Sequence, residues 1–113
     1  MRTINRSALV IVPKEPYIQW IVSLDPSLQG ETEWLREQVS VYLVAEDPEG
    51  SEESAPVTDY FSRIFEYELE GWDEDRRLWP KKRSFALFQQ WFDVRAQSIV
   101  TDLERAPLTW EEL

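Results

Sequence analysis

The sequence predicts one small α/β or α+β domain, in which about three strands are covered by three or four helices. Short β-rich runs alternate along the chain with segments whose apolar residues recur every three or four positions. The length of 113 residues suits one domain, because two smaller cores would each need disulfides or metals to close. Apolar residues make up 42% of the chain, including six tryptophans. This composition is rich enough to form a core, so we expect residues 1–113 to fold as one unit.

The first half of the chain predicts a strand, a helix, a helical turn and a second strand. The run 8–12 is wholly apolar, is largely β-branched and ends at a proline, which is typical of a strand buried on both faces. Residues 16–24 follow with a proline in the first turn and apolar side chains at spacings of three, four and seven. A single helical turn capped near Thr32 comes next. The β-rich run 39–44 then predicts the second strand.

The second half predicts two helices and a third strand. Apolar residues spaced by three or four indicate a helix over 56–71, with a glycine where it ends. The charged connector 73–83 contains a Trp-Pro pair and predicts a loop or a single turn. Ser84 is placed to cap a helix, after which residues 92–100 change to the alternating period of a strand. The expected order is therefore β-α-β-α-α-β, followed by a loosely packed tail from about residue 104.

Charge favours a basic partner. The chain carries 22 acidic and 12 basic residues, giving a formal net charge of −10. Repulsion at this charge disfavours nucleic acid and anionic membranes as partners. The acids concentrate over 46–75, whereas 76–83 holds five basic residues. No signal-peptide core or membrane-spanning run is present, and the lack of cysteine suits the cytoplasm, so we expect a cytoplasmic protein without a membrane association.

The residues on which much enzyme chemistry depends are missing. The sequence contains neither histidine nor cysteine, which excludes the usual serine triad, cysteine nucleophiles and thiolate zinc sites. Its three glycines are widely separated, so neither a phosphate-binding loop nor a dinucleotide-binding turn is present. We therefore predict no catalytic residues, no cofactor and no metal site, and we expect that the protein is not an enzyme.

The junction between acidic and basic residues is the candidate interaction surface. Trp72 and Trp79 bracket the charge reversal in a connector, where tryptophan often anchors interfaces. A lid over the core is the alternative interpretation for both rings. The acids and bases beside them are either docking groups or a solvated surface. The full candidate surface comprises Glu46, Asp47, Glu49, Glu52, Glu53, Trp72, Asp73, Glu74, Asp75, Arg76, Arg77, Trp79, Lys81, Lys82 and Arg83.

Segments spread along the chain carry one resemblance. They are Asn-Arg-Ser-Ala-Leu-Val at 5–10, Pro-Lys-Glu-Pro-Tyr at 13–17, Trp-Pro at 79–80, Phe-Ala-Leu-Phe at 85–88 and Trp-Phe-Asp-Val at 91–94. With these segments the sequence resembles small bacterial proteins of about 110 residues that have no assigned function. The resemblance covers nearly the whole chain and implies a bacterial, single-domain protein. It implies no activity, ligand or site residue.

Three functional hypotheses follow from these observations. The first is a noncatalytic acidic interaction protein that binds a basic protein partner. The second is a small ligand-binding domain or enzyme that uses carboxylates, tyrosine and arginine in a pocket. The third is a nucleic-acid mimic, whose carboxylates imitate phosphates. For the pocket of the second hypothesis, the candidates beside apolar positions are Asp59, Tyr60, Arg63, Asp93 and Arg95.

The oligomeric state is a separate question. A homodimer is one hypothesis, because an exposed edge strand or unburied tryptophans would support it.

Overall fold

The computed structural model describes residues 1–46 and 57–113, and it has the α+β architecture that the sequence predicts. Strands and helices follow in the expected order, with a short strand added at each end of the series. The helices are α1 (Glu15–Leu24), α2 (Thr32–Arg36), α3 (Phe61–Glu70) and α4 (Phe85–Trp91), the strands are β1 (Arg2–Thr3), β2 (Arg6–Pro13), β3 (Ser40–Ala45), β4 (Phe92–Gln97) and β5 (Thr101–Asp102), and 3₁₀ segments span Pro26–Glu31, Val57–Asp59 and Arg76–Leu78.

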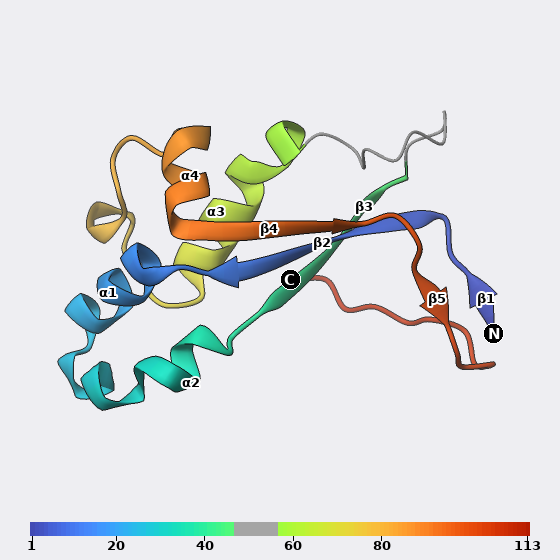
Figure 1. The fold of residues 1–113 in the computed structure, drawn as a ribbon, viewed down its shortest axis with the longest axis horizontal. Helices are drawn as coiled ribbons and strands as arrows, with labels where there is room; N and C mark the ends of the chain where they lie inside the picture. Colours follow the sequence, from blue (N-terminus) through green and yellow to red (C-terminus); the bar gives the residue numbers. More distant parts are fainter. Residues whose placement is uncertain (47–56) are drawn as a thin grey trace.

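The main sheet has β2 at its centre, in the order β3-β2-β4, and both pairings are antiparallel. The register places Leu9 between Tyr42 and Ala96. A separate antiparallel pair, β1 with β5, lies at the end of the strands away from α1 and α2 (Figure 1). Each strand of this sheet runs opposite to its neighbour, so β3 and β4 run parallel to each other, and the segment that contains α3 and α4 connects them across β2.

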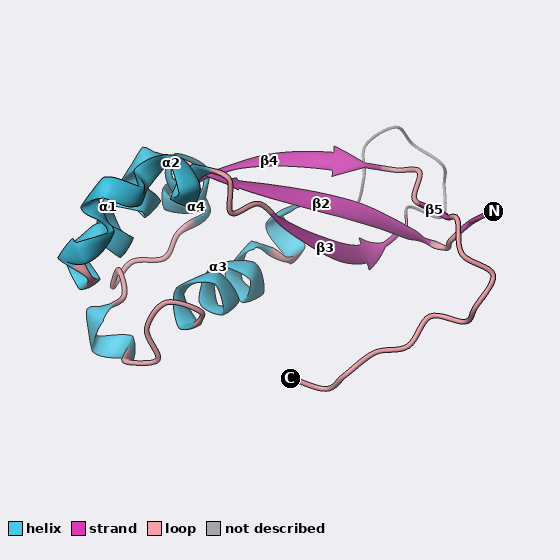
Figure 2. Cartoon of the chain, turned by 90° about the horizontal axis from the view of Figure 1, so that it is seen from below, coloured by secondary structure: helices cyan, strands magenta, loops and turns pink. Residues whose placement is uncertain are grey.

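Helices cover one face of the main sheet. Figures 1 and 2 show α1, α2 and α4 gathered at one end of the strands, with α3 lying against one face. The core forms between these helices and the sheet, and the ring of Phe65 lies 5.6 to 5.7 Å from three other aromatic rings. Its buried members are Leu9, Ile11, Tyr17, Ile18, Ile21, Leu35, Val44, Ile64, Phe65, Leu69, Trp79, Phe88 and Phe92.

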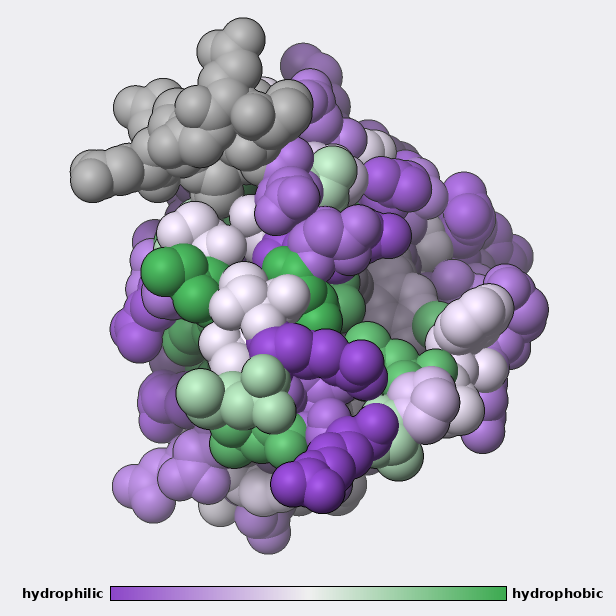
Figure 3. Space-filling view, turned by 90° about the vertical axis from the view of Figure 1, so that its right-hand side faces the viewer, coloured by the Kyte–Doolittle hydropathy of each residue, from purple (hydrophilic) through white to green (hydrophobic). Residues whose placement is uncertain are grey.

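The other face of the sheet is only partly buried, which corrects the expectation for residues 8–12. Leu9 and Ile11 are buried toward the helices, whereas Val10 and Val12 on the opposite face are half-buried. On the edge strand β3, alternate side chains point away from the helices and are well exposed. Figure 3, which looks toward the helices from the opposite end of the strands, shows apolar side chains among polar ones. The apolar run therefore marked the central strand rather than a strand covered on both sides.

The element boundaries follow the sequence closely, with two differences. Ser84 caps α4 as expected, because its hydroxyl accepts a hydrogen bond of 3.1 Å from the backbone N–H of Leu87. Thr32 does not cap α2; it is the first residue of that helix, and Glu31 precedes it without a side-chain cap. The helix expected over 56–71 is shorter, since a 3₁₀ turn comes before α3.

The chain after β5 carries no helix or strand up to its last residue. Leu108 and Trp110 are 63% and 82% exposed, so neither anchors the tail to the core. In Figures 1 and 2 the tail runs back from β5 and ends apart from the helices.

Candidate functional site

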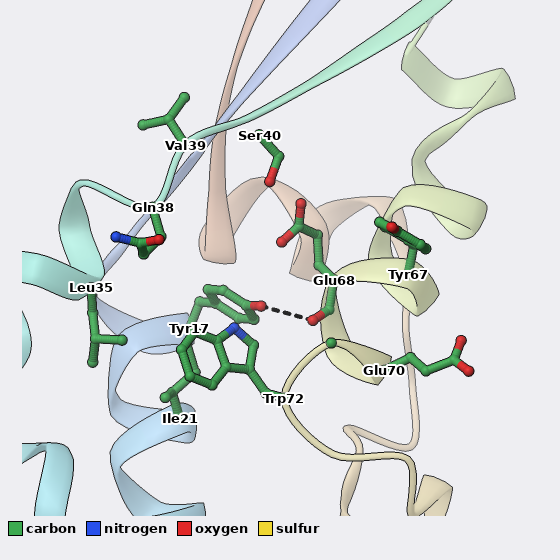
Figure 4. Close-up of a pocket in the computed structure, with 11 residues that line it drawn as sticks. Tyr17, Ile21, Leu35, Gln38, Val39, Ser40, Tyr67, Glu68, Glu70 and Trp72 are labelled. Carbon is green, nitrogen blue, oxygen red and sulfur yellow. Dashed lines mark hydrogen bonds between the residues drawn. The ribbon is translucent and has the colours of Figure 1, made fainter. Parts of the chain in front are cut away.

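A pocket of about 390 Å³ opens beside the C-terminal end of α3. Its walls come from four places in the sequence: the buried face of α1, the end of α2, the segment entering β3, and the last turn of α3 with the residues after it. Figure 4 shows these side chains arranged around a common space. The pocket is lined by Tyr17, Ile21, Leu35, Gln38, Val39, Ser40, Tyr67, Glu68, Glu70, Gly71 and Trp72.

Glu68 is held in this pocket by two tyrosine hydroxyls. The hydroxyl of Tyr42, on β3, donates to Oε1 of Glu68 at 2.6 Å. The hydroxyl of Tyr17, on α1, donates to the backbone carbonyl oxygen of Glu68 at 2.9 Å (Figure 4). That carbonyl belongs to the last turn of α3, where the carbonyls have lost their partners within the helix and need other donors. The two bonds therefore fix both the end of the helix and the direction of its carboxylate.

The two tyrosines stay protonated donors over a wide pH range. Burial raises the pKa of the Tyr17 hydroxyl above its ordinary value, and the nearby charge of Glu68 raises it further. Burial also raises the pKa of the Tyr42 hydroxyl, followed by its hydrogen bond to the same carboxylate. Both effects disfavour a phenolate beside Glu68.

Negative charge in the pocket has no cation to offset it among the described lining residues. Glu68 and Glu70 are both carboxylates of the last turn of α3, and this turn contains no basic residue. The carbonyl end of a helix carries the negative end of its dipole, which adds to the charge of these acids. The pocket therefore attracts a positively charged group.

Aromatic rings supply the other chemistry of the pocket. Tyr17 is buried, Trp72 is half-buried and Tyr67 is 50% exposed at the rim. In Figure 4 the indole of Trp72 lies beside the ring of Tyr17, and the carboxylate of Glu68 points toward Ser40. Carboxylates next to aromatic faces suit the binding of a cation that also has an apolar part. The chain has no histidine or cysteine to add nucleophilic or imidazole chemistry.

Trp79 does not present its ring to a partner, which corrects one part of the expected interaction surface. It is only 4% exposed, and its indole N–H donates to the backbone carbonyl of Asp73 at 2.8 Å. The guanidinium groups of Arg76 and Arg83 lie over its ring, 5.0 and 5.5 Å from the centroid. The lid interpretation therefore describes Trp79, whereas Trp72 reaches the pocket.

The charged connector is partly neutralised within the fold. Asp75 accepts two hydrogen bonds from the Arg77 side chain, of 3.0 and 2.9 Å. This contact lowers the pKa of Asp75 and raises the pKa of Arg77. Arg83 donates to the carbonyl of Pro80 and lies 3.6 Å from a carboxylate oxygen of Glu66.

The remaining residues of the expected interaction surface differ in their exposure, and some of them are not described by the structure. Glu46, Glu74, Lys81 and Lys82 are exposed, and Asp73 is half-buried, where its carboxylate caps the backbone N–H of Asp75. Four acids of that surface lie outside the described residues: Asp47, Glu49, Glu52 and Glu53.

The five residues expected for a polar pocket are also not brought together. Tyr60 and Arg63 line a second pocket of about 280 Å³ between β3 and α3, where the guanidinium lies 5.4 Å from the Tyr60 ring centroid. Asp93 and Arg95 form an exposed ion pair on β4, and Asp59 is exposed. The pocket at the end of α3 is built from other residues, and Trp72 is the one lining residue that the sequence analysis selected.

Further observations restrict the classes of site. In residues 1–46 and 57–113, no group of three or more acidic side chains is placed to hold a metal ion. No helix in the same residues has the length and apolar character needed to cross a bilayer. The chain matches no protein-family model, and comparisons with curated proteins and with solved structures gave no significant match.

Proposed function

We propose that the protein is a noncatalytic interaction protein that binds a basic surface of a partner protein. The observation that carries this proposal is the pocket at the end of α3, where the carboxylate of Glu68 lies at the negative end of a helix without a cation in the described lining. The net charge of −10 acts in the same direction over a longer range, because it attracts a basic partner and repels acidic ones.

The arrangement of the pocket supports binding more than catalysis. Its central carboxylate is already engaged by Tyr42, and the two tyrosines beside it are held neutral by burial. General acid-base work at neutral pH needs a group whose pKa lies near that pH, and these tyrosines are shifted away from it. A fixed carboxylate with aromatic neighbours is the arrangement that a binding site needs.

The test is an association measurement at two ionic strengths. Partners captured from the native host at low salt would be purified, and association rates measured at about 10 mM and about 150 mM salt, where the screening length falls from about 30 to about 8 Å. We expect the rate to drop severalfold, and neutralising Glu70 and Glu74 together to lower it at low salt. A wild-type chain that captures no partner at low salt, or a salt-independent rate, contradicts the proposal.

The same pocket favours a second candidate, a domain that binds a small molecule. Its volume of about 390 Å³ lies within the usual range for ligand pockets, and polar groups converge on it. A small cationic compound that raises the thermal stability of the isolated chain, and does so less for Glu68→Gln, would support this candidate.

A further inference from the structure

We propose that the pocket at the end of α3 receives one basic side chain of the partner, with Glu68 as the counter-ion of its guanidinium or ammonium group. This inference rests on the proposed function, and it names the site and the chemical group that the partner contributes. The aliphatic part of the incoming side chain would lie along Ile21 and Trp72, and its charge would lie at the carboxylate.

The carboxylate of Glu68 is oriented before any ligand arrives. Tyr42 donates to one of its oxygens at 2.6 Å, and Tyr17 fixes the backbone of the same residue at 2.9 Å. A carboxylate accepts about four hydrogen bonds, so the tyrosine leaves acceptor positions for a second donor. Because the group is held by β3 and α1, little ordering entropy is lost when a cation binds.

The aromatic walls favour an organic cation over a simple ion. Trp72 and Tyr17 place two rings next to the acidic end of α3 (Figure 4). Aromatic faces attract cations, and arginine and lysine also carry alkyl stems that pack on such rings. Ser40 and Gln38 line the same space and offer further polar contacts to a guanidinium group.

Other aromatic sites of the chain show what is missing here. At Trp79 two arginines of the chain lie over the ring, and at Tyr60 one does. Within residues 1–46 and 57–113, no arginine or lysine makes the same contact with Trp72 or Tyr17. The pocket thus combines aromatic rings with a carboxylate, and its described lining contains no arginine or lysine.

The first part of the test uses a short peptide as the probe. A tripeptide with a central arginine and blocked ends would be titrated into the full chain, and its affinity measured by calorimetry. The same peptide with citrulline, which is neutral and nearly isosteric, is the matched control. We expect the arginine peptide to shift the indole N–H resonance of Trp72 in a saturable way, with the resonance assigned through Trp72→Phe. Citrulline should bind at least tenfold more weakly.

The second part uses two variants that each remove one negative charge, one inside the pocket and one outside it. Glu68→Gln keeps an acceptor for Tyr42 and should weaken the peptide and the purified partner about tenfold or more, as expected for a lost charged hydrogen bond. Glu74→Gln, outside the pocket lining, should change peptide affinity less than about twofold. Should Glu68→Gln unfold, Trp72→Leu replaces it, because this change removes the aromatic face and leaves the carboxylate in place.

The outcomes separate the two proposals. If the partner binds the wild type and Glu68→Gln equally well while salt still slows association, the pocket inference is wrong and the proposed function stands. If no partner binds the wild type at low salt, the proposed function fails, whatever the peptide does. Agmatine, a free guanidinium compound with an alkyl stem, serves as a third probe. Binding of agmatine tenfold tighter than the arginine peptide would overturn the assignment to a partner side chain in favour of a small molecule.

Discussion

The hydrogen bond between Tyr42 and Glu68 is the contact whose removal tests the pocket most directly. Tyr42→Phe deletes only the hydroxyl, which donates to the carboxylate at 2.6 Å. A hydrogen bond to a charged acceptor contributes about 1.5 to 3 kcal/mol to the free energy of unfolding. Both side chains are half-buried, so water from the pocket can reach the carboxylate after the change. We therefore expect a loss near the lower end, about 1.5 kcal/mol.

Tyr67→Phe is the matched control for this measurement. Its ring packs edge-on against Tyr42 with centroids 6.1 Å apart, but the side chain is 50% exposed. Removing its hydroxyl should change the free energy of unfolding by less than about 0.5 kcal/mol. Urea unfolding followed by tryptophan fluorescence measures both variants under identical conditions.

A double-mutant cycle then isolates the pairwise interaction. Glu68→Ala, which removes the acceptor that glutamine would keep, is measured alone and together with Tyr42→Phe, and we expect a coupling energy of about 1 kcal/mol between the two positions. If Tyr42→Phe is as stable as the Tyr67→Phe control, or if the coupling is zero, the hydroxyl does not hold the carboxylate. The reasoning about an oriented counter-ion would then be refuted.

Three further measurements follow from the structure. Burial raises the pKa of Tyr17 and Tyr42 in the folded chain above the value of about 10 for an exposed tyrosine. The free energy of unfolding should therefore stay constant with respect to these two groups below about pH 10. Above that pH it should fall by up to about 1.4 kcal/mol per pH unit for each tyrosine, as measured by urea unfolding. Ser84→Ala removes the cap of α4 and should cost about 1 kcal/mol by urea unfolding, whereas Ser98→Ala, at an exposed bend, should cost almost nothing. Deleting residues 106–113 should alter the free energy of unfolding by less than about 0.5 kcal/mol, and a larger loss would show that the tail packs on the domain.

Features decided by neighbours in the chain could be predicted from the sequence. The cap at Ser84 depends on an N–H three residues later, and the change from helix to strand at Phe92 depends on a change of apolar period. The prediction that Thr32 caps α2 was wrong, because a residue's preference for capping positions does not decide between adjacent residues at the start of a helix.

Trp79 illustrates a feature that local patterns do not decide. Its place in a charged connector beside a proline left two interpretations open, an exposed contact surface and a lid over the core. In the fold, the same charged neighbours supply what a buried indole needs: the carbonyl of Asp73 accepts its N–H, and Arg76 and Arg83 cover its faces. A tryptophan with charged neighbours in the sequence can therefore be buried when those neighbours cover its ring faces and accept its N–H.

The pocket could not be predicted because its contacts join distant parts of the chain. Tyr17 is 51 residues from Glu68, and Tyr42 is 26 residues from it. The sequence predicts α1, α3 and β3, but apolar periodicity does not specify which turn of α3 faces the other two elements. Two general requirements did point toward it: a buried tyrosine hydroxyl needs an acceptor, and the last turn of a helix has acceptors to offer. Together these requirements favour the end of α3, where the Tyr42 hydroxyl orients the carboxylate of Glu68.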